Sequence, residues 1–181
     1  MPGKTPHPER SPDGHSYGVR AETVAFDPER FFKNETFLYG VDLFNCGYFW
    51  EAHAEWERCW KGAPRASPAR AFLQALIQVA AASVKGRASQ GAGAEKLLRK
   101  AREKLGELGR RHGRFSGVDV LNLTRRIDES LQTLESDPRR DSPEGWLRHI
   151  WLASPCAILA LFELSQLFRL SLLFERLHAF D

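Results

Sequence analysis

Four segments of this chain begin with the same helix-start signal, a capping residue followed directly by proline. The pairs are Asp27-Pro28, Ser67-Pro68, Ser142-Pro143 and Ser154-Pro155. The capping oxygen accepts a backbone N–H that has no partner at the start of a helix, and proline in the first turn removes no helical hydrogen bond. These pairs predict four helix N-termini and make a helical fold the expectation.

Apolar residues recur three, four and seven positions apart along most of the chain, as one face of a helix requires. This spacing predicts five bundle helices, over about residues 28–44, 48–61, 68–85, 93–108 and 118–134. The helix over 68–85 is apolar around most of its circumference, so we expect it to be the central one. No segment alternates with a period of two. The predicted fold is therefore all-α, a compact bundle of about five helices with no sheet.

Composition divides the chain into three parts. Residues 1–26 contain four prolines among glycine, serine and charged residues, which predicts a disordered tail. Residues 27–134 form the predicted helical bundle. Residues 135–181 follow as a predicted C-terminal helical extension, in which the Leu- and Phe-rich residues 156–178 are expected to form an apolar helix.

The apolar helix over 156–178 is not predicted to cross a membrane. A span needs about 20 mainly apolar residues, and Glu163, Gln166 and Arg169 interrupt this segment at three-residue intervals. A helix of this kind requires burial on most sides, against the bundle or against a second copy. We therefore expect a homo-oligomer, most simply a homodimer, formed through the C-terminal apolar helix.

The overall composition excludes several classes of protein. With 43% hydrophobic residues among 181, the chain can bury a core, so global disorder is excluded. The three cysteines show neither a disulfide framework nor a zinc spacing, and no secretory signal opens the sequence, so we expect reduced thiols in the cytoplasm. Neither a GxSxG motif nor a phosphate-binding loop occurs, which leaves nucleophilic catalysis without support. No cofactor is expected.

Three ordered blocks resemble a known family. They are FNCGYFWEAH at 44–53 with Trp56-Glu57 and Trp60, then FLQALIQVAA at 72–81, then Gly91 to Ala94 leading into Leu97-Leu98 and Leu105. Together they resemble Domain of Unknown Function 309, a family of bacterial, archaeal and plant proteins, over about residues 37–108. The resemblance implies a small all-helical bundle and no established reaction. Ala54 departs from the family, which usually has glutamate directly after the histidine.

The first candidate site lies on the predicted helix over 48–61. His53 and Glu57 are one helical turn apart, beside Trp56 and Trp60. A carboxylate beside a histidine suits a general base or a metal ligand, which leaves a metal-dependent hydrolase as one alternative. We favour a hydrogen-bonded core pair, because structural pairs have the same appearance. Glu51 is not on one face with His53, so no metal is expected; His53 and Glu57 are the only candidate ligands.

Gln74 and Gln78 are one turn apart on the helix predicted to be most buried. Buried amides are costly unless each donor and acceptor is matched. If the second and third helices pack together, these amides are natural partners for His53 and Glu57. We favour a structural polar network, and the alternative is the floor of a small polar pocket with walls of Trp56 and Trp60.

Positive charge is concentrated in the second half of the chain. Residues 85–140 contain 14 Lys+Arg and 8 Asp+Glu, while the whole chain carries only +3. Arg110, Arg111 and Arg114 are the densest point, and an RNA-associated protein is the corresponding alternative. However, Glu95 and Glu103 each lie four residues from Arg99, as on a solvated helix face. We therefore do not expect nucleic acid as a partner.

The sequence predicts a non-catalytic binding or interaction module with a small polar and aromatic pocket, whose ligand it does not define. The candidate pocket residues are His53, Glu57, Trp56, Trp60, Gln74, Gln78 and Glu51.

Overall fold

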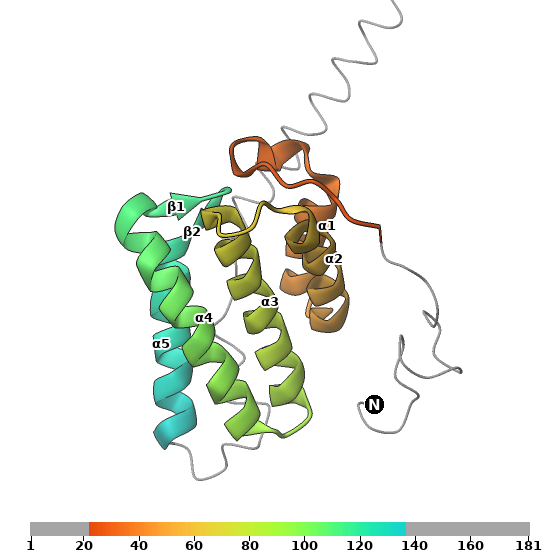
Figure 1. Ribbon diagram of the computed structural model, residues 1–181. Helices are drawn as coiled ribbons and strands as arrows, with labels where there is room; N and C mark the ends of the chain where they lie inside the picture. Colours follow the sequence, from red (N-terminus) through yellow and green to blue (C-terminus); the bar gives the residue numbers. More distant parts are fainter. Residues whose placement is uncertain (1–21, 137–181) are drawn as a thin grey trace, which may run out of the picture.

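The computed structural model describes residues 22–136, which form a helical bundle with one short hairpin (Figure 1). The all-α prediction is confirmed. The elements are η1 (Pro28–Lys33), α1 (Glu35–Asn45), α2 (Phe49–Gly62), α3 (Pro68–Arg87), α4 (Gly91–His112), β1 (Arg114–Phe115), β2 (Val118–Asp119) and α5 (Val120–Ser136). The predicted apolar helix over 156–178 and the Ser142 and Ser154 caps lie outside the described residues.

The expectation of no sheet is corrected at four residues. Strands β1 and β2 form an antiparallel hairpin in which Phe115 is opposite Val118. The turn between them has positive φ at Ser116 and Gly117, a conformation that glycine adopts at little cost. Two-residue strands are too short to show alternation, which is why the sequence pattern did not predict them.

The predicted helix over 28–44 is two elements rather than one. Asn34 has an extended backbone and separates the 3-10 helix η1 from α1. Its side-chain oxygen accepts from the Phe37 N–H at 2.8 Å, which caps α1, and its amide nitrogen donates to the Ala25 carbonyl at 2.9 Å. The predicted cap at Ser67 is confirmed, because its hydroxyl oxygen accepts from the Arg70 N–H at 3.1 Å.

Consecutive helices pack against each other along the bundle, in the order α1, α2, α3, α4 and α5 (Figure 1). Helix α3 lies between α2 and α4 and contributes buried residues along its whole length, from Ala69 to Gly86. None of the helices within residues 22–136 is long and apolar enough to span a membrane.

Residues 22–26, which the sequence assigned to the tail, contact α2. The Val24 N–H donates to the Arg58 carbonyl at 3.1 Å, and Phe26 is buried against Phe37, with ring centroids 5.1 Å apart. This extended segment therefore covers the end of α2 before η1 begins.

Candidate functional site

Helix α2 places His53 on the ring of Trp50, three residues earlier. The two rings are nearly parallel, at an interplanar angle of 15° with centroids 5.9 Å apart. His53 is half-buried and Trp50 is 39% exposed. The stack presents an aromatic surface at the start of α2.

Trp56 lies in the core between α1 and α2. Its side chain is fully buried, its indole N–H donates to the Phe37 carbonyl at 3.3 Å, and its ring lies 5.7 Å from that of Phe44. The ring packs directly against Gly40 of α1. Trp56 therefore fixes one helix to the other and presents no surface to solvent.

The carboxylates of α2 contact basic residues of the same helix. The Lys61 ammonium donates to Glu57 at 3.4 Å, and the Arg58 guanidinium donates to Glu55 at 2.7 Å. Glu51 is exposed. Within residues 22–136 no group of three His, Cys, Asp or Glu side chains lies close enough together to hold a metal ion.

Trp60, at the end of α2, is covered by Arg70 of α3. The guanidinium carbon lies 4.0 Å from the centre of the indole ring, and the same group donates to the carbonyls of Trp60 at 2.9 Å and Ala63 at 2.8 Å. The indole N–H of Trp60 is nevertheless buried without a hydrogen-bond partner among the described residues. Sequence reasoning identified Trp60 but missed Arg70, because the two meet only when α2 and α3 pack.

The two amides of α3 are half-buried. The side-chain oxygen of Gln78 is buried, and within the described part of the chain no donor reaches it. In the predicted network of His53, Glu57, Gln74 and Gln78, at least one acceptor, the Gln78 side-chain oxygen, therefore has no hydrogen-bond donor among the described residues.

A second arginine holds the other end of α2 to α3. The Arg87 guanidinium lies 4.5 Å from the centre of the Phe49 ring and donates to the Gly47 carbonyl at 2.7 Å. Because α2 and α3 are antiparallel, Arg70 and Arg87 fix opposite ends of the same interface. Trp50, His53 and Glu57 lie on the stretch of α2 between them.

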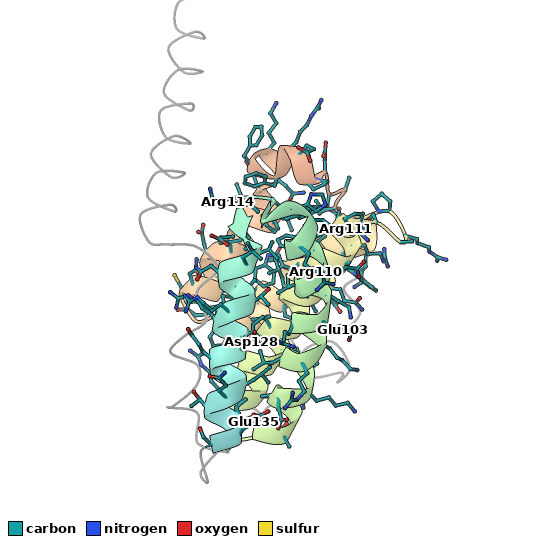
Figure 2. All side chains as sticks on the ribbon, turned by 90° about the vertical axis from the view of Figure 1, so that its left-hand side faces the viewer. Glu103, Arg110, Arg111, Arg114, Asp128 and Glu135 are labelled. Atoms are coloured by element: carbon teal, nitrogen blue, oxygen red, sulfur yellow. The ribbon has the colours of Figure 1, made fainter. Side chains whose placement is uncertain are left out.

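The predicted basic cluster lies at one end of the bundle. Arg110 and Arg111, near the end of α4, and Arg114, in β1, are all exposed (Figure 2). Arg111 pairs with Glu107 at 3.2 Å. Cations at the C-terminal end of a helix also interact favourably with its dipole, so part of this cluster stabilises α4.

Cys59 is buried beside Asn34, with its sulfur 3.7 Å from the Asn34 side-chain oxygen. Burial raises the pKa of the Cys59 thiol to about 11. A thiol with that pKa carries almost no thiolate at neutral pH, so it is a poor nucleophile. Cys46, in contrast, is exposed at the end of α1.

Residues 37–97, from early in α1 into the first turns of α4, match the family model described as domain of unknown function (DUF309). This match confirms the resemblance drawn from the sequence and includes His53, Glu57 and both glutamines. No curated protein matches the chain. Within residues 22–136 the chain is thus a helical bundle whose DUF309-like region includes α1, α2 and α3.

Proposed function

We propose that this chain is a non-catalytic interaction module whose contact surface lies along the exposed edge of α2 and α3. The observation that carries the proposal is a pair of open polar atoms, one from each helix. The Trp60 indole N–H and the Gln78 side-chain oxygen are buried without partners in the described part of the chain. A buried polar atom without a partner costs about 1–3 kcal/mol, and a bound group recovers that energy when the side chains that cover the atom move aside.

The side chains of this surface have the chemistry of binding surfaces. Tryptophan and arginine are enriched among residues that dominate binding energy, because they combine apolar area with a polar group. The proposed contact residues are Trp50, His53, Glu57, Trp60, Gln74 and Gln78, with Glu51 at the border. Trp56 is left out because it is fully buried.

The partner we propose is residues 156–178 of a second copy. The sequence of this segment is rich in Leu and Phe and also contains Glu163, Gln166 and Arg169. A carboxylate or amide oxygen can accept from the Trp60 indole, and an amide or guanidinium can donate to Gln78. The result is a homodimer. Because Cys46 and Cys59 are free thiols, we place it in the cytoplasm as part of the proposal.

Sedimentation equilibrium of the full chain tests this proposal. The wild type is expected to be a dimer, and the double substitution Leu167→Glu/Phe174→Glu is expected to give a monomer. Ser165→Glu/Ser171→Glu, which adds the same charge to the same segment, should remain a dimer. A monomeric wild type, or equal masses for both double variants, would refute the contact.

Substitutions on α2 test the other side of the contact. Trp50→Ala should raise the dimer dissociation constant at least about tenfold, whereas Glu51→Ala, at the border, should leave it nearly unchanged. Elemental analysis of the same preparations addresses the alternative. Stoichiometric metal that His53→Ala removes would replace this proposal with the metal-dependent hydrolase.

A further inference from the structure

Among the basic residues of α4, Arg99, Arg102 and Arg111 are neutralised by carboxylates. On the flank that faces α5, Arg99 pairs with Glu135 and Arg102 pairs with Asp128. Figure 2 shows Asp128 and Glu135 along α5, next to α4. The carboxylates of α5 therefore balance the charge of this flank.

The lysines of α4, in contrast, have no carboxylate partner among the described residues. Lys96, Lys100 and Lys104 recur every four residues, and none forms an ion pair within residues 22–136. Residues four apart lie on one side of a helix. We call these three residues the α4 lysine stripe.

Helix α3, the other neighbour of α4, cannot neutralise the stripe. It contains no Asp or Glu, and its charged residues are Arg70, Lys85 and Arg87. The Lys85 side chain packs over Gly93 of α4, which brings one of these cations to the start of the stripe. The carboxylates nearest in sequence are Glu95, which pairs with Arg99, Glu107, which pairs with Arg111, and Glu103.

The stripe is a row of three positive charges, with Glu103 and Glu107 one turn after Lys100 and Lys104 on the same helix. At 1.5 Å per residue, Lys96, Lys100 and Lys104 rise about 6 Å at each step and about 12 Å in all. Lysine is a flexible point charge that binds phosphate without the fixed geometry of a guanidinium. A row of this kind suits a linear polyanion with regularly spaced charges.

Although no nucleic-acid partner is expected from the sequence, we propose that the α4 lysine stripe binds the phosphate backbone of a nucleic acid without reading its sequence. This surface is distinct from the α2–α3 edge and does not depend on its function. A membrane is a poorer partner, because amphipathic helices bind lipid by inserting large apolar side chains. The exposed large apolar residues of the described chain are Phe32, Tyr39, Tyr48, Trp50 and Leu121, and none is on α4.

Fluorescence anisotropy with the full chain tests the proposal, using labelled 20-nucleotide uridine and thymidine oligomers between 50 and 200 mM NaCl. Both oligomers should bind, with affinity that falls steeply with salt. Lys96→Gln/Lys100→Gln/Lys104→Gln removes three phosphate contacts, so the slope of log K against log salt should fall by about 2, at about 0.7 per contact on a single strand. Affinity at 50 mM NaCl should fall at least about tenfold.

Two matched variants separate the stripe from net charge. Lys33→Gln/Arg65→Gln/Arg125→Gln removes the same charge from exposed residues of η1, the α2–α3 loop and α5, and it should keep the wild-type slope. Substituting all three stripe lysines by arginine should keep binding. Glutamine and arginine both favour helix, and far-UV circular dichroism verifies folding.

Three outcomes would overturn the proposal. The first is no binding of either oligomer at 50 mM NaCl, and the second is an equal loss of affinity in the stripe variant and its charge-matched control. The third is equal or tighter binding to phosphatidylserine vesicles or to polyglutamate, which would assign the stripe to a membrane or to an acidic protein instead.

Discussion

Replacing Gly40 by alanine should destabilise the bundle, although the same change stabilises most helices. Gly40 lies inside α1, and an added Cβ would lie 2.4 Å from the indole nitrogen of Trp56 and 2.7 Å from its Cδ1. Trp56 is fully buried and cannot turn into solvent. The clash must therefore push the two helices apart or displace the indole.

The expected size of the effect follows from three contributions. Overpacking a close-packed core costs about 1–3 kcal/mol, and loss of the hydrogen bond from Trp56 to the Phe37 carbonyl costs about 1 kcal/mol more. Replacing a glycine inside a helix by alanine returns about 0.5–1 kcal/mol. We expect the free energy of unfolding of Gly40→Ala to fall by about 2 kcal/mol.

Urea denaturation, followed by circular dichroism at 222 nm, measures the change. Gly106→Ala is the matched control, because it also lies inside a helix but its nearest neighbour, an Arg110 nitrogen, is 3.9 Å away. Gly106→Ala should raise the free energy of unfolding by about 0.5–1 kcal/mol. In a Trp56→Phe background the cost of Gly40→Ala should be smaller. Equal effects at Gly40 and Gly106 would contradict the proposed packing.

Three further predictions follow from close contacts. Gly62→Ala should lower the free energy of unfolding, measured by urea denaturation, by about 1–3 kcal/mol, because its Cβ would lie 2.2 Å from the Val24 carbonyl oxygen. An unchanged urea midpoint would contradict this. Arg70→Met keeps the apolar part of the side chain but loses two hydrogen bonds, so the free energy of unfolding should fall by about 1–3 kcal/mol. At pH 8, peptide mass spectrometry should find Cys46 alkylated by iodoacetamide long before Cys59, whose pKa is about 11; equal rates would contradict its burial.

Local signals in the sequence predicted the helices but not the break at Asn34. The cap at Ser67 uses only atoms within three residues, so sequence could identify it. Asn34 instead separates η1 from α1 while it also bonds to the Ala25 carbonyl, in a segment that composition assigned to a tail. That bond forms only when the segment folds back, and helical spacing carries no information about it.

The candidate site, too, could be predicted only in part from the sequence. Spacing placed His53, Trp56 and Trp60 near one side of a helix but could not tell which ring is buried. That depends on Gly40 of α1, which leaves room for the Trp56 indole. The contact between Trp60 and Arg70 likewise depends on how α2 packs on α3.

The packing of each helix mainly against its neighbours in the sequence has a kinetic consequence. Contacts between consecutive helices close short loops, and chains rich in local contacts fold in microseconds to milliseconds. One contact is different, because the Ser116 hydroxyl donates to the Pro28 carbonyl at 3.3 Å across 88 positions of the chain. Such a distant pair forms after the helical hairpins, so the junction of η1 with the β1–β2 hairpin is expected to be the last part of the described bundle to assemble.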